Sequence, residues 1–213
     1  MFDGLIDVVG DVHGEIGPFR LLLKQLGYDS EGHHPEGRRL VFVGDLGDRG
    51  PDSPAVGEVV MGLVGRGVAQ CVLGNHELNL LRAEDKAGNA WFMNPDRKEQ
   101  RPGGEFAHSQ VATQDFKVRY LKFLATLPLV LERPDLRVVH AAWVPGEIEA
   151  LRGASGSVLS VYRSYETAME TQLRQEGLKD RMDREKSEWR RAIHDRHATA
   201  FNRLNAIGSL FFY

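Results

Sequence analysis

The stretch "LIDVVGDVHG" (residues 5–14) joins a short apolar run to a turn that contains an aspartate, a histidine and two glycines. The apolar run predicts a buried β-strand, and Asp11 and His13 follow it two residues apart. Two such side chains at the end of a strand can reach one point in space, as a pair of metal ligands does. One pair is weak evidence, so the prediction depends on how the other strands end.

Three further apolar runs end in polar residues of the same kind. "RRLVFV" (38–43) leads into "GDLGDRG" (44–50), "VAQCVL" (68–73) leads into "GNHE" (74–77), and "LRVVH" (136–140) ends in a histidine. Because ligands collect at the carboxyl ends of parallel strands, we expect these segments to converge. The converging set is Asp11, His13, Asp45, Asp48, Arg49, Asn75, His76, Glu77 and His140.

The chemistry of this set favours a divalent metal. Carboxylate, amide and imidazole ligands suit zinc, manganese or iron better than calcium, and the set lacks the thiolates of a structural zinc site. A single aspartate or histidine at a strand end is usually a turn or cap residue. Several polar groups that converge without a ligand would repel one another and stay unsatisfied, so the whole set predicts a metal centre.

Helical patterns separate the predicted strands. Residues 18–28 and 116–128 each place apolar side chains on one helical face, and so do residues 53–67. In the last of these we expect Ser53 to be the N-cap and Pro54 to lie in the first turn. Strands that alternate with helices predict an α/β domain with much parallel pairing.

A long polar segment, residues 84–105, interrupts this alternation. Its Trp91, Phe92, Arg97 and Arg101 could form a lid that stacks a base and contacts phosphates. The alternative is a solvated loop with one apolar anchor. The sequence leaves both interpretations open.

The composition changes beyond Ser155, where the chain becomes charged and helical. Two helical faces of different phase meet at Gly177, which predicts two helices joined there. We therefore expect a core over residues 1–150 and a mostly helical segment over residues 151–213, packed on the core or extending it.

The bulk composition excludes several classes of function. The chain has 213 residues and a net charge of −3, so it lacks the general basic character of a nucleic-acid binder, and we expect no such contact beyond a phosphorylated end. Cys71 is the single cysteine, which rules out an internal disulfide and fits a reducing cytoplasm. No leader pattern and no apolar run of about 18 residues is found, so we expect a cytoplasmic protein without a membrane partner.

Taken in order, GDxHG, GDxxDRG, GNHE and a later strand that ends in histidine resemble the calcineurin-like metallophosphoesterases. The arginine of "DRG", Arg49, narrows the resemblance to the phosphoprotein-phosphatase branch, which includes serine/threonine phosphatases, diadenosine tetraphosphatases and RNA-repair phosphatases. The resemblance extends over residues 6–143, about two-thirds of the chain. It implies a metallophosphoesterase sandwich of mixed β-sheets flanked by helices, with a helical C-terminal segment.

The resemblance also implies a dinuclear centre of two divalent metal ions. Asp11 and His13 would hold the first ion, Asp45 would bridge both, and Asn75 and His140 would hold the second. Manganese is favoured, with iron, zinc, nickel or cobalt as alternatives.

The roles implied for three further residues complete a hydrolytic site. A water shared by two cations would supply a hydroxide that attacks phosphorus. His76 would act as the general acid on the leaving oxygen, and Asp48 would orient its imidazole. Arg49 would bind two phosphoryl oxygens.

The sequence departs from the family pattern at the second metal. Relatives have one more metal-binding histidine, usually in a Gly-His pair, and no such pair follows His140. The later histidines, His194 and His197, lie in a charged helical pattern, and a second phosphate-binding arginine cannot be assigned. Either the chain is a shortened version with one ligand fewer, or water or another residue replaces that ligand.

These observations predict a phosphatase that hydrolyses phosphate esters. We expect a broad phosphomonoesterase or a nucleoside-polyphosphate hydrolase, with a phosphorylated small molecule or nucleotide as substrate. A serine/threonine protein phosphatase acting on a phosphoprotein is the alternative. A hypothesis of another class is a weakly active or inactive metal-binding remnant that acts through a partner.

Overall fold

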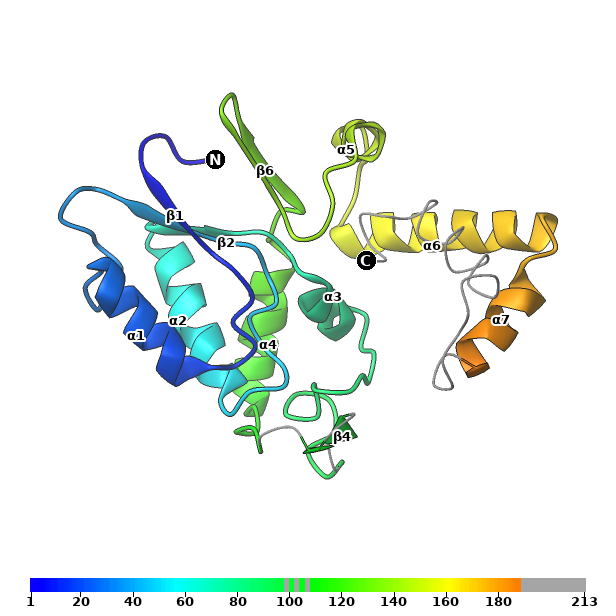
Figure 1. Ribbon diagram of the computed structural model, residues 1–213, viewed down its shortest axis with the longest axis horizontal. Coiled ribbons are helices and arrows are strands. Elements are labelled where there is room, and N and C mark those ends of the chain that lie inside the picture. The colour runs from blue at the N-terminus through cyan, green and yellow to red at the C-terminus, as the bar shows by residue number, and fades with distance from the viewer. Residues whose placement is uncertain (98–99, 102–103, 106–107, 189–213) are drawn as a thin grey trace. The chain divides into compact units, whose positions relative to one another are not determined.

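The computed structural model of the chain describes residues 1–188, except residues 98–99, 102–103 and 106–107. The chain divides into two compact units, Met1–His140 and Ala141–Tyr213, and each is described by itself (Figure 1). The boundary after residue 150 that the composition suggests stays a prediction.

The first unit contains two layers of strands. The parallel sheet has the order β1-β2-β3, with β1 at Ile6–Val9, β2 at Arg39–Phe42 and β3 at Ala69–Cys71. Strands β6 (Val130–Arg133) and β7 (Leu136–Val139) form an antiparallel hairpin. The strands predicted from the apolar runs are therefore present, and the sheets are mixed as expected.

The central strand β2 has one face toward each neighbouring layer, because side chains alternate along a strand. Val41 packs with Val72, Leu131 and Val138, which places the β6–β7 hairpin on its face of the sheet. Phe42 lies on the opposite face and meets Phe19 of helix α1, with ring centroids 5.7 Å apart. This burial on both faces explains why β2 reads as a continuous apolar run.

Helices α1 (Ile16–Leu26) and α2 (Ser53–Gly65) connect the strands of the parallel sheet. Helices α3 (Asn75–Leu81) and α4 (Gln114–Leu124) follow its last strand, β3. Helices α1 and α2 lie side by side (Figure 1). Both follow a parallel strand, as the alternating pattern predicts.

The start of α2 differs from the prediction by one residue. Asp52, and not Ser53, is the N-cap, and its side chain accepts a hydrogen bond of 2.9 Å from the backbone N–H of Ala55. The hydroxyl of Ser53 accepts instead from the backbone N–H of Asp48, also at 2.9 Å. Ser53 therefore supports the turn before the helix.

The polar segment between α3 and α4 is partly ordered by its own contacts. A two-stranded antiparallel pair, β4 (Gln100–Arg101) and β5 (Gly104–Glu105), lies inside the region expected to be a loop. Residues 84–94, here called the 84–94 loop, precede this pair.

The second unit is helical over its described residues. It contains α5 (Pro145–Arg152), α6 (Val158–Gln175) and α7 (Lys179–Glu188). Gly177 separates α6 from α7 with a φ of 68°, a left-handed conformation that glycine adopts without a Cβ penalty, so the predicted break at this residue is confirmed. No helix in the described part of the chain is long and apolar enough to cross a membrane.

Candidate metal centre

The turns that follow β1, β2 and β3 lie together at the carboxyl end of the parallel sheet. The carbonyl oxygen of Asp45 accepts hydrogen bonds from the backbone N–H groups of Val12 and His13, both at 3.0 Å. The carbonyl of Leu46 accepts from Gly14 at 2.8 Å. These bonds join the GDVHG turn to the GDLGDRG turn, so the convergence expected from the sequence is present.

Glycine lets the second and third turns approach each other. Gly44 has a φ of 97°, and a Cβ added there would lie 2.5 Å from the backbone nitrogen of Gly74. No side chain fits at that distance. Gly44 and Gly74 therefore let the two backbones approach closely, so that Asp45 and Asn75, the residues that follow them, lie near each other.

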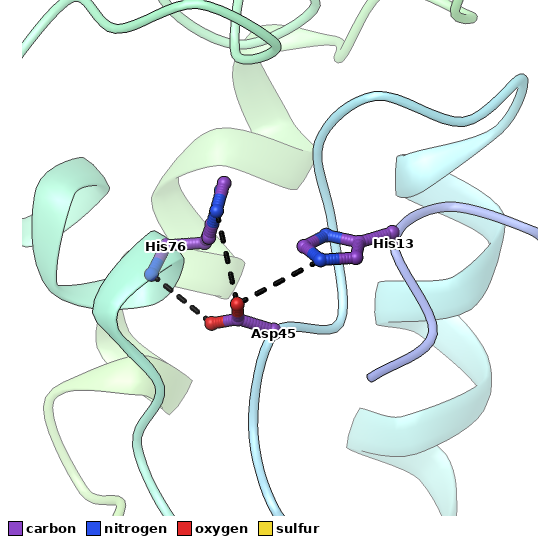
Figure 2. Close-up of side chains that lie close together, drawn as sticks. All are labelled: His13, Asp45 and His76. Carbon is purple, nitrogen blue, oxygen red and sulfur yellow. Dashed lines mark hydrogen bonds and ion pairs between the residues drawn. The ribbon is translucent and has the colours of Figure 1, made fainter. Parts of the chain in front are cut away.

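Asp45 is the centre of the site, and its side chain is almost completely buried. Its Oδ2 lies 3.8 Å from Nε2 of His13 and 3.7 Å from Nε2 of His76 (Figure 2). Its Oδ1 lies 3.4 Å from Nε2 of His140 and accepts from the backbone N–H of His76 at 3.2 Å. Asp45 is thus within reach of imidazoles from three separate segments.

Two groups of side chains with metal-binding atoms share this aspartate. One consists of His13, Asp45 and His76, and the other of Asp11, Asp45 and His140. In each group the candidate ligand atoms lie within 4.8 Å of one another. Asp45 belongs to both groups, but the groups place His76 with His13, and Asp11 with His140, so the assignment of ligands to the two metal ions stays a prediction.

Hydrogen bonds to backbone carbonyls orient the imidazole rings of His13 and His140. Nδ1 of His13 lies 3.0 Å from the carbonyl of Gly47, and Nδ1 of His140 lies 2.8 Å from the carbonyl of Val43. A carbonyl only accepts, so each Nδ1 donates to its carbonyl, and this bond turns each Nε2 toward Asp45. Metal-binding histidines are held in this way, and the donor set therefore fits a divalent cation.

Asn75 lies beside the second group. Its Oδ1 is 2.9 Å from Nε2 of His140. Asp11 is the most open member of the predicted set, with 51% of its side chain exposed, and its Oδ2 lies 3.8 Å from Nε2 of His13. The other four residues predicted as metal ligands therefore lie close to Asp45 or to a histidine beside it.

His76 and Asp48 form a close pair next to this centre. Nδ1 of His76 donates to Oδ2 of Asp48 at 2.6 Å, and both side chains are buried. Burial opposes the charged imidazole, but the hydrogen bond to Asp48 and the negative charge of Asp45 outweigh it, so the pKa of His76 is raised. His76 thus has the environment of a group that holds a proton.

Arg49 extends from the same turn and is exposed. Its guanidinium lies 3.0 Å from Nε2 of His13 and 2.9 Å from Nε2 of His76. Its backbone N–H donates to the carbonyl of Gly88 at 3.0 Å. The guanidinium therefore lies at the open side of the candidate centre.

Backbone strain is concentrated here. His13, Asp45, Asp48 and Arg49 have φ values of 47°, 50°, 72° and 68°, in the left-handed region. This conformation costs a non-glycine residue roughly 1 kcal/mol. Such strain persists where surrounding bonds over-determine the backbone, as they do at functional sites.

Glu77 supplies some of these bonds. It is 1% exposed and accepts from the backbone N–H groups of Asp45 at 2.8 Å, Leu46 at 2.9 Å and Gly74 at 3.2 Å. Burial, and then the negative charge of Asp45, raise the pKa of Glu77. Its oxygens face the backbone, so Glu77 supports the turns.

The lid interpretation of the polar segment does not agree with the structure for its aromatic residues. Trp91 is 2% exposed and Phe92 is 5% exposed, so neither ring is free to stack a base. Arg97 pairs with Asp85. His194 and His197, considered above for the last metal ligand, lie outside the described residues.

Sequence reasoning missed two contacts to the site. The indole N–H of Trp91 donates to Oδ1 of Asp48 at 2.7 Å, and the carbonyl of Gly88 holds Arg49 as described above. The one signal in the sequence was a tryptophan in an otherwise polar loop.

Fold and site together define a class: an α/β protein whose parallel strands end in a carboxylate- and imidazole-rich candidate metal centre. The family model of the calcineurin-like phosphoesterases matches residues 4–201. The chain therefore belongs to the calcineurin-like phosphoesterase family, which confirms the resemblance and the predicted fold class.

Curated relatives share a tetraphosphatase name. The bis(5'-nucleosyl)-tetraphosphatase PrpE [asymmetrical] of Geobacillus sp. (strain WCH70) is 50% identical over 80 residues, 36% of this chain and 33% of that protein. The protein of the same name from Oceanobacillus iheyensis is 30% identical over 145 residues, 64% of this chain and 54% of that protein. The chain thus spans about a third to a half of the length of these relatives.

Among solved structures, the metallophosphoesterase from Sphaerobacter thermophilus is similar with a TM-score of 0.40. Its sequence is 21% identical, and the match covers 64% of this chain and 46% of that chain.

Proposed function

We propose that the protein is a metal-dependent phosphoesterase that hydrolyses phosphate esters, with nucleoside polyphosphates as the favoured substrate class. One observation carries the proposal: two histidine–carboxylate groups share Asp45, and His76, a member of one of them, also pairs with Asp48 and lies beside Arg49. Family membership and the name of the curated relatives support it.

Five side chains would hold the metal ions. Asp11, His13 and Asp45 would bind the first divalent cation, and Asp45, Asn75 and His140 the second, with manganese favoured. When bound, such cations activate water and stabilise charge on phosphoryl oxygens.

His76 would hold the proton that the leaving oxygen needs. Asp48 accepts from Nδ1 of His76, which aligns the ring and stabilises its protonated form. The opposite nitrogen, Nε2, faces Asp45 and Arg49, where a phosphate ester would bind. Proton transfer from Nε2 to the leaving oxygen would then release the alcohol or nucleotide.

Arg49 would bind the phosphoryl group. Its guanidinium lies between His13 and His76 and offers several N–H donors in one plane. This fork matches two phosphoryl oxygens and would stabilise the charge that develops on them.

The cellular location of the protein and the structure of its C-terminal segment are part of the same proposal. A single cysteine, Cys71, fits a reducing cytoplasm. Residues 151–213 would form a helical segment packed on the core or extending it.

The first experiment counts bound metal while activity is measured. Metal-stripped protein is titrated with manganese, and hydrolysis of p-nitrophenyl phosphate is followed. We expect activity to rise with the second equivalent. One bound equivalent with background activity would contradict the proposal and favour a metal-binding remnant. Bis-p-nitrophenyl phosphate, diadenosine tetraphosphate and a phosphopeptide, compared under the same conditions, rank the substrate classes.

The variant His76→Ala separates a proton donor from a metal ligand. Because general acid catalysis contributes about 100- to 10,000-fold, we expect kcat to fall by about that factor while two metals per chain still bind. The exposed His33, varied to alanine, is the matched control and should change neither quantity. Unchanged turnover in His76→Ala would disprove the role of His76, and loss of metal would make it a ligand.

A further inference from the structure

The 84–94 loop has a defined shape despite its polar sequence. Asn89 is 0% exposed, donates to the carbonyl of Glu84 at 2.8 Å, and accepts from the backbone N–H of Lys86 at 3.0 Å. These bonds close the loop upon itself. Trp91 follows two residues later and packs in an aromatic cluster formed by Trp91, Phe92, Phe116 and Tyr120.

The loop contacts the candidate site at two adjacent residues. The indole N–H of Trp91 donates to Oδ1 of Asp48 at 2.7 Å, and the carbonyl of Gly88 accepts from the backbone N–H of Arg49 at 3.0 Å. Asp48 and Arg49 both have left-handed backbones. The loop therefore holds two of the three strained residues of the turn, and the proposed mechanism uses both.

The contact of Trp91 defines the direction of the Asp48 carboxylate. The terminal torsion of an aspartate is broad and roughly two-fold, so a carboxylate with one partner can turn. Here Oδ1 has the indole N–H and Oδ2 has Nδ1 of His76 at 2.6 Å. With one donor on each oxygen, the carboxylate plane is fixed and the imidazole of His76 is held with it.

We propose that Trp91 is a positioning residue for the proton donor His76, acting through Asp48; this inference rests on the proposed function. A buried indole needs a partner for its N–H, and many backbone carbonyls would serve. The partner here is the carboxylate that orients His76. Tyr120, in the same aromatic cluster, makes no hydrogen bond through its hydroxyl within the described part of the chain, so polar contact is not a general feature of this cluster.

The first test uses two substrates that differ in their leaving group. Phenyl phosphate releases a more basic oxygen than p-nitrophenyl phosphate, so its hydrolysis depends more on the proton donor. In Trp91→Phe, which keeps an aromatic ring but loses the N–H donor, we expect kcat for phenyl phosphate to fall at least about tenfold further than kcat for p-nitrophenyl phosphate.

The matched control is Phe116→Leu, which removes a ring from the same aromatic cluster without touching Asp48. It should lower the melting temperature but leave the ratio of the two kcat values unchanged. An equal loss on both substrates in Trp91→Phe would show that Trp91 only fills the core, and would overturn the inference. If the wild type has no metal-dependent turnover at all, the proposed function fails, and the positioning role fails with it.

A second test needs neither metal nor turnover, and it does not depend on the folding of Trp91→Phe. The indole N–H signals of metal-free, nitrogen-15-labelled protein are recorded for the wild type and for Asp48→Asn. Replacing a charged acceptor by a neutral one should move the proton signal of Trp91 upfield and leave Trp143 in place. An indole spectrum that does not change in Asp48→Asn would overturn the inference.

Discussion

The GDLGDRG turn and the 84–94 loop differ in almost every respect that a sequence shows. The turn, residues 44–50, is glycine-rich and contains Asp45, Asp48 and Arg49, which are the groups with chemistry. The loop is polar, without an evident motif, and contains no group that we place in contact with the substrate or a metal ion. Yet the turn has three strained residues, whereas the loop is closed upon itself by Asn89.

The contrast shows that reactive groups and their supports lie in different parts of the chain. The turn holds Asp48 and Arg49 in left-handed conformations, and donors and acceptors from outside it stabilise that backbone. Ser53 binds the N–H of Asp48, Gly88 binds that of Arg49, and Trp91 binds the carboxylate. Geometry at the site therefore depends on segments without a recognisable motif.

The largest effect on stability is expected where the turn receives most of its support. Glu77→Gln replaces an oxygen acceptor by an amide N–H₂ that would face backbone donors. Each unsatisfied buried donor costs about 1–3 kcal/mol, so we expect the free energy of unfolding to fall by about 3 kcal/mol. Urea unfolding of metal-stripped protein measures it.

The exposed Glu31→Gln is the control for this substitution and should leave the unfolding curve in place. If Glu77→Gln were as stable as the wild type, the turn would need no hydrogen-bond acceptor from another segment. The contrast between the turn and its supports would then be wrong.

A smaller effect is expected from opening the loop. Asn89→Ala removes the two hydrogen bonds that close the 84–94 loop, which should cost about 1–2 kcal/mol. Residues 84–94 should become more sensitive to limited proteolysis, and kcat should fall as Trp91 loses its position. Asn94→Ala, an exposed change in the same loop, is the matched control. Faster cleavage with full activity would show that the loop does not support the geometry of the site.

The smallest effect is expected at Asp7, which lies outside both segments. Tyr28 donates to Oδ2 of Asp7 at 2.8 Å, and so does Nε of Arg38 at 2.8 Å. The hydrogen bond from Arg38 lowers the pKa of Asp7. The stabilisation is therefore present above the ordinary pKa of an aspartate and is lost as the pH falls through the lowered value.

Asp7→Asn should thus cost about 1 kcal/mol at neutral pH and nothing in strong acid, with kcat unchanged. Urea unfolding at several pH values measures the difference between variant and wild type. A difference that does not shrink in acid would argue against the charged pair.

Much of the architecture could be predicted from local patterns. The apolar runs located β1, β2, β3 and β7, and the break at Gly177 lies between α6 and α7. The start of α2 was wrong by one residue, because Ser53 is used by Asp48 and leaves the N-cap to Asp52. A capping pattern shows which residues can cap a helix, but not which of them another segment already occupies.

Part of the site could also be predicted from the sequence. Asp11, His13, Asp45 and Asn75 follow parallel strands, whose ends lie together, so their convergence follows from the order of elements. His140 follows β7 of the antiparallel hairpin and reaches the site because that hairpin packs on the parallel sheet. The burial of Trp91 did not follow, since the adjacent aromatic residues Trp91 and Phe92 in a polar loop fit a lid as well as an anchor.

By itself, the sequence determined which residues carry reactive groups and that they meet at one edge of a sheet, since both follow from residue type and from strand order. Only the tertiary structure decided which atoms face one another: the Nε2 atoms toward Asp45, and the two Asp48 oxygens toward His76 and Trp91. The physical reason is that hydrogen-bond direction depends on backbone conformations and packing between distant segments, and no local pattern records them.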